Sequence, residues 1–315
     1  KKKKYKNLKE IKSLFQKYKR SDFSIHSIIE KNEESQPSKP YITSTINQSS
    51  PYSIKKTSMI LQKLYQQGFI TYIRTDSYKM STEAKNMMKK YIIDKYGENY
   101  FKYRTFDKKN KSSQEAHECI RVTNVNKLSN EIDDPQEKKI YDLIWKRSLE
   151  CLMENSKFHS KDIKINVSET KKKFQKKINY FYFLGFKILS NTLDELNKDC
   201  LFFDKIQTND KLEYIIINFK KKYISSGSRY NESKLVKELE KLGIGRPSTY
   251  ATILKKIQDK EYVNKVKGAM IPTFTGYAVV QFLEKYYEDL VNLKYTSSME
   301  DELDKISIGD ASKEN

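Results

Sequence analysis

The sequence predicts an α+β protein with more than one domain, because the spacing of its apolar residues changes twice. Residues 55–153 carry apolar side chains at helical spacing, and residues 160–219 alternate apolar and polar side chains as strands do. Helical spacing returns after residue 229. At 315 residues, the chain is long enough for two domains or one elaborate domain.

The N-terminal third is predicted to be a basic segment, a linker and a first helix. Residues 1–30 are basic with scattered apolar positions, and residues 31–40 are polar with two prolines. A helix is predicted over residues 55–67, and Gly68 ends it. Its apolar stripe consists of Ile60, Leu61, Leu64 and Tyr65. Residues 69–75 are rich in β-branched and aromatic side chains, which predicts a short extended segment.

Two further helices and a helical turn are predicted before residue 160. Ser81 is a good N-cap for a helix that ends at Gly97. Residues 114–121 are predicted to form at least a helical turn, and residues 137–153 a strong helix. Beyond them, Ile163, Ile165 and Val167 alternate with polar residues, and residues 180–188 and 212–219 are also strand-like.

The last third has the pattern of a winged helix-turn-helix. One helix carries Leu235, Val236, Leu239 and Leu242 on one face and ends at Gly243. Ser248 is the expected cap of the next helix, and residues 262–271 form a two-stranded wing around Lys267 and Gly268. Helices over residues 275–287 and 298–306 complete the chain.

The charge balance favours a polyanionic partner. The chain has 61 Lys and Arg against 41 Asp and Glu, a formal net charge of +20. Nucleic acid is the first candidate and an acidic membrane surface the second, although a bias toward A+T-rich codons would also enrich lysine. There is no apolar run near the ~18 residues of a membrane span. The three cysteines are far apart, so neither a disulfide framework nor a zinc site is predicted.

Tyr72, Arg74 and Asp76 are the first candidates for chemistry. In an extended backbone their side chains project to the same side. A phenolic oxygen can attack a phosphodiester while an adjacent arginine neutralises the charge of the transition state. The alternative is an Arg–Asp pair at a strand end, beside a tyrosine of the core.

Two other segments could bind phosphate. On a helix, His117 and Arg121 would share a face, although a solvated histidine is the simpler explanation. Residues 243–250 form a glycine-rich turn that opens a helix, where free N–H groups attract anions. Arg246, Ser248 and Thr249 would strengthen that site.

Together these segments resemble the type IA DNA topoisomerases, and specifically the bacterial topoisomerase I branch. The family pattern Ile-Thr-Tyr-x-Arg-Thr-Asp-Ser occurs here at residues 70–77. A Gln-Asp/Glu-Ala-His-Glu-Ala-Ile-Arg-Pro pattern matches residues 114–122, and a pattern ending in Gly-Ile-Gly-Arg-Pro-Ser-Thr-Tyr-Ala matches residues 233–251. Order and spacing agree as well, and three long motifs in order are highly specific.

The resemblance implies a toroidal core and an ATP-independent isomerase that relaxes negatively supercoiled DNA. Tyr72 would cleave one strand, hold its 5′ phosphate as a phosphotyrosine, and allow religation after strand passage, with Arg74 stabilising the scissile phosphate. The other residues implied to contact single-stranded DNA or to orient such groups are Asp76, His117, Arg121, Arg246, Ser248, Thr249 and Lys260. A monomer is expected.

The resemblance also implies four regions. They are an N-terminal strand of a β-rich arch with a linker (1–38), a helical domain with the nucleophilic tyrosine (39–157), the arch (158–228) and an incomplete winged-helix-like DNA-binding domain (229–315).

Several departures from the family pattern matter. Lys260 stands where the family usually has arginine, Val122 replaces the usual proline, and the loop at residues 49–54 is short. The Mg²⁺ that the family uses is implied to bind an Asp-x-Asp-x-Glu motif in a toprim domain, which this sequence lacks. We therefore expect the chain to be the middle of a longer enzyme and to be inactive alone.

Two other functions remain open at this point. The chain could be a non-catalytic single-stranded DNA-binding module, or a nucleoid or membrane-surface protein that binds through charge. Only the enzyme needs Tyr72, Arg74 and His117 together. Cytosolic, nuclear and organellar locations all fit the composition.

Overall fold

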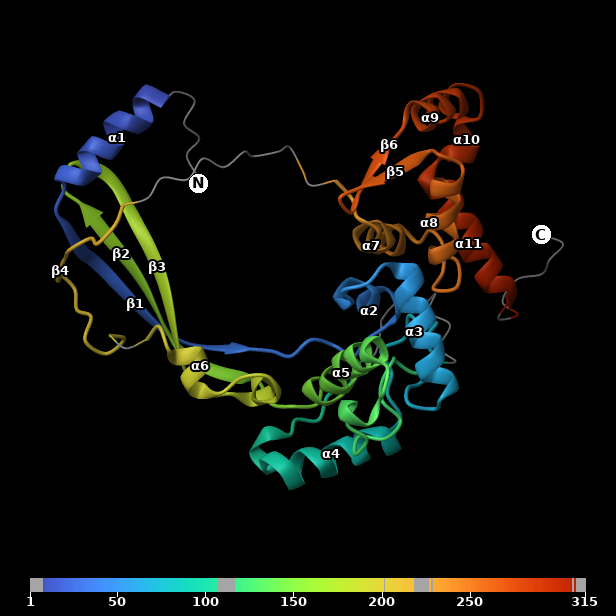
Figure 1. Ribbon diagram of the computed structural model, residues 1–315, viewed down its shortest axis with the longest axis horizontal. Coiled ribbons are helices and arrows are strands. Elements are labelled where there is room, and N and C mark those ends of the chain that lie inside the picture. Colours follow the sequence, from blue (N-terminus) through green and yellow to red (C-terminus); the bar gives the residue numbers. More distant parts are fainter. Residues whose placement is uncertain are drawn as a thin grey trace. The chain divides into compact units, whose positions relative to one another are not determined.

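The computed structural model describes residues 8–106, 117–200, 202–217, 227, 229–307 and 309, which fall into two compact units (Figure 1). The sheet unit combines Lys1–Pro37 with Glu154–Ile224, and the helical unit combines Ser38–Met153 with Ser225–Asn315. Each unit is therefore built from two separate stretches of chain. Helices and antiparallel strands are both present, which confirms the predicted α+β class. The four regions drawn from the resemblance stay a prediction.

The sheet unit is organised around one antiparallel sheet of four strands in the order β3-β2-β1-β4. The strands are β1 (Phe23–Ser35), β2 (Ser156–Val167), β3 (Thr170–Phe183) and β4 (Lys211–Leu212). The helical elements are α1 (Leu8–Arg20), η3 (Gly185–Leu189) and α6 (Leu193–Asn197). Ile28 pairs with Ile163 in the register, so the central strands place apolar residues opposite one another.

Three features of the sheet unit differ from the sequence prediction. The helix α1 was not predicted, although residues 11, 14, 15 and 18 are apolar at helical spacing. Strand β3 begins ten residues before the predicted start at residue 180, because its lysine-rich half pairs with β2 in spite of its polar sequence. The strand predicted over residues 212–219 is reduced to the short β4, and residues 218 and 219 lie outside the described residues.

The helical unit contains most of the helices and a separate two-stranded wing. Its first stretch holds α2 (Thr43–Ser49), α3 (Ile54–Gln66), α4 (Thr82–Tyr96), η1 (Glu98–Tyr100), η2 (Ser129–Glu131) and α5 (Pro135–Glu150). Its second stretch holds α7 (Glu232–Leu242), α8 (Tyr250–Asp259), β5 (Val263–Val266), β6 (Ala269–Pro272), α9 (Phe274–Tyr286), α10 (Glu288–Val291) and α11 (Leu293–Ser307).

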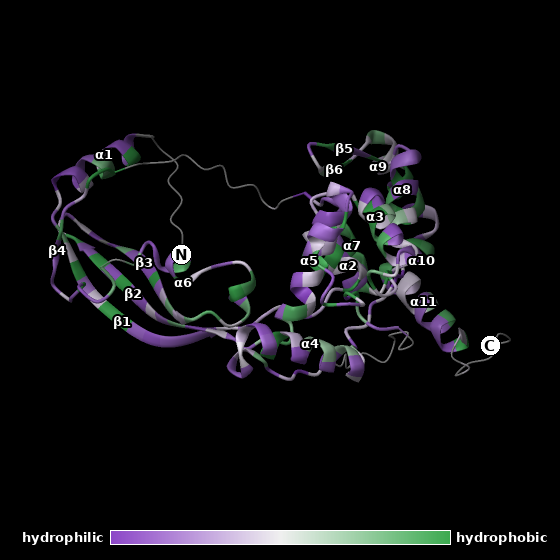
Figure 2. Cartoon of the chain, turned by 60° about the horizontal axis from the view of Figure 1, so that its bottom comes forward, coloured by the Kyte–Doolittle hydropathy of each residue, from purple (hydrophilic) through white to green (hydrophobic). Residues whose placement is uncertain are grey.

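Local sequence signals explain where the main helices begin. The hydroxyls of Ser53 and Ser81 accept backbone N–H groups at the starts of α3 and α4, and the carboxylate of Asp134 does so for α5. Figure 2 shows hydrophobic and hydrophilic stretches alternating along these helices, as amphipathic packing requires. None of the described helices is both long enough and apolar enough to cross a membrane.

A small apolar cluster joins the two stretches of the helical unit. Ile54, at the start of α3, packs with Val236, Tyr250, Leu254 and Met270, all of which are buried. The wing formed by β5 and β6 is present as predicted, and its strands pair across the turn at Lys267 and Gly268. The cluster therefore fixes the winged-helix stretch against α3.

Within α3, three of the four predicted core positions are buried, and Leu64 is completely so. We expect Leu64→Ala to lower the free energy of unfolding by about 2–5 kcal/mol, because the lost side chain leaves a cavity. Urea denaturation would measure the change. Met59→Ala on the same helix is the control, since Met59 is 59% exposed and its loss should cost about 0.5 kcal/mol or less. Equal losses for the two variants would contradict the packing of α3.

Candidate active site

The extended segment from Phe69 to Lys79 is tied to its neighbours by two threonine hydroxyls. The hydroxyl of Thr43, in the first turn of α2, accepts the N–H of Thr75 (2.9 Å) and donates to the carbonyl of Ile73 (2.7 Å). The hydroxyl of Thr71 accepts the N–H of Arg121 (2.9 Å). Because these bonds connect different parts of the chain, the segment cannot rotate about its own axis.

The predicted alternation of side chains is present in this segment. Ile73, Thr75 and Ser77 are 5%, 3% and 4% exposed and face the interior. Tyr72 and Asp76 are half-buried and Arg74 is exposed, so all three remain accessible. The segment thus presents a phenol, a guanidinium and a carboxylate along one side, without the cost of full burial.

Residues 117–123 lie beside this segment in extended form, so the helix predicted over residues 114–121 is wrong for its described part. Ile120 bridges to Tyr41 and Val122 bridges to Ile70. The backbone N–H and C=O groups are used in these bridges, and tertiary pairing has replaced the local helical preference. Residues 114–116 lie outside the described residues.

The change from helix to extended chain separates His117 from Arg121. The ring of His117 lies 4.8 Å, centroid to centroid, from the ring of Tyr72. Arg121 is mostly buried and its Nε donates to Glu118 at 2.7 Å. Only the histidine therefore belongs to the site, and the cationic patch predicted for the pair does not form.

Tyr72 is held between two rings from different segments. Tyr65, near the end of α3, contacts it edge to face with centroids 5.5 Å apart, and His117 lies at 4.8 Å. Tyr65 was predicted as part of the α3 core stripe, but it is 38% exposed. Its position at the C-terminal end of the helix places it beside the extended segment instead of under the helix.

A tight loop between α7 and α8 contributes the remaining predicted groups. Gly243 and Gly245 have φ angles of +72° and +74°, and a Cβ at Gly245 would lie only 3.0 Å from Ile253. Both positions therefore require glycine. The predicted cap Ser248 does not cap α8. The N-cap is Thr249, whose hydroxyl accepts the N–H of Arg246 at 2.8 Å and so closes the loop.

These three segments meet in one pocket of about 160 Å³. It is lined by Tyr72, Arg74, Thr75, Asp76, His117, Arg246, Pro247 and Ser248. Six of the nine residues predicted for the site are thus brought together from positions up to 176 residues apart. Arg121, Thr249 and Lys260 do not line it. Lys260 is exposed at the end of α8.

Acidic residues of α11 form a feature of this region that sequence reasoning missed. Arg246 pairs with Asp304 at 2.8 Å, and Glu300 and Asp301 lie 3.6 and 3.7 Å from its guanidinium. Burial alone would lower the pKa of Arg246, but the hydrogen bond to Asp304 and the three negative charges raise it. No local pattern in the sequence indicates this pairing, because Arg246 lies over fifty residues before the acidic residues of α11.

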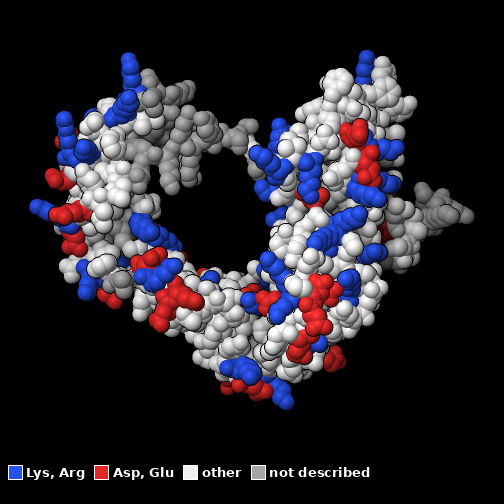
Figure 3. All heavy atoms as spheres, in the orientation of Figure 1, with Lys and Arg blue, Asp and Glu red and all other residues white. Residues whose placement is uncertain are grey.

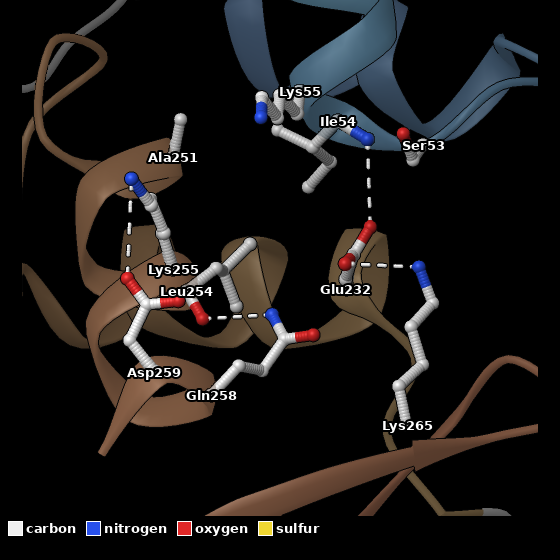
Figure 4. A pocket seen from close by; sticks show the side chains of 10 residues that line it. All are labelled: Ser53, Ile54, Lys55, Glu232, Ala251, Leu254, Lys255, Gln258, Asp259 and Lys265. Atoms are coloured by element: carbon white, nitrogen blue, oxygen red, sulfur yellow. Dashed lines mark hydrogen bonds and ion pairs between the residues drawn. The ribbon is translucent and has the colours of Figure 1, made fainter. Parts of the chain in front are cut away.

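Two larger cavities lie away from this pocket, beside the N-terminus of α3. One, of about 300 Å³, is lined by residues of α3, α7, α8 and β5 (Figure 4). Its polar groups are paired with one another: Glu232 accepts the N–H of Ile54 at 3.4 Å and pairs with Lys265 at 2.9 Å. The other shares Ser53, Glu232 and Lys265 with it. Of these three cavities, only the smaller pocket combines a tyrosine with two arginines and a histidine, so it is the better candidate.

The basic surface of the helical unit is consistent with an anionic ligand. On the face shown in Figure 3, Lys and Arg side chains gather over α7 and the wing, where Lys234, Lys237, Lys241 and Lys265 are exposed.

Among the described residues, no group of three or more His, Cys, Asp or Glu side chains is placed to hold a metal ion. The residues described here therefore do not fit the Mg²⁺ implied by the sequence resemblance.

Cys119 lies close to the pocket but is unsuited to be its nucleophile. The side chain is completely buried, and burial raises the pKa of its thiol to about 12. At pH 8 only about one molecule in ten thousand would carry the reactive thiolate. Among the side chains of the pocket itself, Tyr72 has the chemistry of a nucleophile and is accessible.

We expect iodoacetamide at pH 8 to leave Cys119 unmodified in the native protein, because its thiol is both buried and neutral. Half-buried Cys200 should react faster, since it is reachable by the reagent. Mass spectrometry of the digested protein would measure each site, and denaturation in urea should expose both thiols. Modification of Cys119 as rapidly as Cys200 under native conditions would contradict its burial.

Comparisons with known proteins confirm the resemblance drawn from the motifs. A family model described as DNA topoisomerase matches residues 1–315. DNA topoisomerase 1 of Rickettsia bellii is 36% identical over 96% of this chain and 40% of its own length. DNA topoisomerase 1 of Aquifex aeolicus is 34% identical over 97% of this chain and 57% of its own length. The chain therefore spans 40% and 57% of the length of these two relatives.

A solved structure matches both the sequence and the fold. The full-length topoisomerase I of Thermotoga maritima superposes with a TM-score of 0.82 over 99% of this chain and 53% of the Thermotoga chain, with 29% identity.

Proposed function

Because this chain belongs to the type IA DNA topoisomerases, we propose that it carries the strand-cleaving tyrosine of a topoisomerase that relaxes negatively supercoiled DNA. One observation carries the proposal. Tyr72 shares a small pocket with Arg74, His117 and Arg246, which come from three separate segments. A structural ion pair or a non-catalytic DNA-binding surface has no need of an accessible phenol at the centre of such a group.

The proposed reaction is a reversible transesterification. The phenolic oxygen of Tyr72 attacks the phosphorus of one DNA strand and releases its proton as the new bond forms. The bond from phosphorus to the 3′ oxygen breaks, and that oxygen takes up a proton to become a free hydroxyl. The phosphodiester of the DNA is exchanged for a phosphodiester to Tyr72 of similar free energy, so no ATP is consumed. The 3′ hydroxyl later attacks the phosphotyrosine to restore the strand.

The basic side chains of the pocket have separate proposed tasks. Arg74 is exposed beside Tyr72 and would neutralise the charge that develops on the scissile phosphate. His117 lies against the Tyr72 ring, where it limits ring rotation and can donate an N–H to phosphate. Arg246 would bind a phosphate of the same strand. Mg²⁺ is used by the family, but the described residues of this chain form no group that would hold it.

The proposal predicts that Tyr72→Phe abolishes the covalent protein–DNA adduct of the full-length protein, a loss of at least about 10³-fold. Single-stranded DNA binding should stay within about threefold of wild type, because backbone charge supplies most of the affinity. Trapping with denaturant and electrophoresis of a labelled strand would measure the adduct.

Tyr65→Phe is the matched control for that experiment. It removes a hydroxyl from the ring that contacts Tyr72 and should leave adduct formation close to wild type. An adduct in Tyr72→Phe, or its loss in Tyr65→Phe, would show that the wrong tyrosine has been assigned.

We also expect residues 1–315 alone to bind single-stranded DNA without relaxing supercoiled plasmid. The exposed lysines and arginines should make binding strongly salt-dependent, with a large loss of affinity between about 50 and 200 mM salt. Fluorescence anisotropy of a labelled oligonucleotide measures binding, and agarose electrophoresis of plasmid measures relaxation. Magnesium-dependent relaxation by this chain would contradict the prediction that it does not relax supercoiled plasmid.

A further inference from the structure

Helix α11 lies directly on the loop that carries Arg246. A Cβ on Gly243 would come within 2.6 Å of the Ser297 hydroxyl, so helix and loop are in close contact. The N–H of Gly245 donates to the carboxylate of Glu300 at 3.1 Å. The acidic side of α11 is therefore packed against the loop that carries Arg246.

The guanidinium of Arg246 is almost fully used by these contacts. Its Nη1 donates to the carbonyls of Gly243 (3.2 Å) and Gly245 (2.9 Å). Its Nε (3.1 Å) and Nη2 (2.8 Å) both donate to one oxygen of Asp304. Four of the five N–H groups of an arginine are thereby engaged. The Nε–Nη2 edge is one of those that can grip a phosphate with two parallel hydrogen bonds, and a carboxylate occupies it.

The local charge also opposes the binding of a phosphate to Arg246. Three carboxylates surround one guanidinium, so this group of side chains is negative as a whole. A phosphate that approached Arg246 with these contacts intact would meet repulsion and would find the Nε–Nη2 edge taken. Yet Arg246 also lines the pocket of Tyr72, where the proposed substrate strand must pass.

We propose that Asp304 is a stand-in for a DNA phosphate, and that binding of the strand exchanges the Asp304 carboxylate on the Nε–Nη2 edge of Arg246 for a backbone phosphate. This inference rests on the proposed function, since it assigns the arginine to the substrate strand. Glu300 and Asp301 oppose any anion that arrives before α11 moves away. Asp304 thus lowers the affinity of the free protein for DNA, and keeps Arg246 ordered until a strand is present.

The test is the sign of the change in DNA affinity. We expect Asp304→Asn in the full-length protein to bind a single-stranded oligonucleotide about three- to tenfold more tightly at low salt, because the competing charge is gone. Fluorescence anisotropy of a labelled oligonucleotide gives the dissociation constant. If Asp304 served only to position Arg246 or to hold α11 in place, the same variant would bind less tightly, which would overturn the proposal.

Glu302→Gln is the matched control. It removes the same charge from the same helix, but Glu302 pairs with Lys305 and not with Arg246. The affinity of this variant for the oligonucleotide should differ from that of the wild type by less than about twofold. Equal tightening in both variants would mean that net charge alone is responsible, and the exchange would be refuted.

Two further variants keep the test decisive. The gain from Asp304→Asn should disappear in an Arg246→Gln background, and a gain that persists there would contradict the exchange. If Asp304→Asn does not fold, Asp301→Asn replaces it, because Asp301 is half-exposed and a smaller gain of the same sign is expected. A wild-type protein that bound no DNA would instead refute the proposed function itself.

Discussion

The hydroxyl groups of Thr43 and Thr71 connect the extended segment at residues 69–79 to the chain on either side of it, and the pocket depends on this connection. Alternating side chains need a fixed backbone before they have fixed directions. Because the backbone is fixed, Tyr72, Arg74 and Asp76 line one pocket, while Ile73 and Ser77 are buried away from it. The proposed chemistry of Tyr72 and Arg74 thus depends on hydrogen bonds of Thr43 and Thr71, which have no proposed part in the reaction.

The same segment shows which parts of the structure could be predicted from the sequence. Alternation, helix caps and apolar stripes are local, so the extended segment, α3, α4 and the wing were all predicted close to their observed positions. The meeting of three motifs in one pocket could not be derived from spacing and came from the family resemblance. Their lining of a single pocket is now a structural observation, while their roles stay a prediction.

What the sequence did not predict depends on partners that are distant in the chain. His117 and Arg121 looked like neighbours on a helix, but pairing of Ile120 and Val122 with other segments made the chain extended. Ser248 looked like a cap, but the Arg246 loop places Thr249 at that position. The carboxylates of α11 are unremarkable in the sequence until the fold puts Arg246 beside them.

The discontinuous make-up of the two units has a consequence for synthesis on the ribosome. Strand β1 can pair with β2 only after β2 has been synthesised, over one hundred residues later. Ile54 can pack against Val236, Tyr250 and Met270 only after an even longer stretch has been synthesised. During elongation the nascent chain exposes an unpaired strand and an uncovered apolar helix end together, a state prone to aggregation. The high density of charged residues would also keep that incomplete chain soluble.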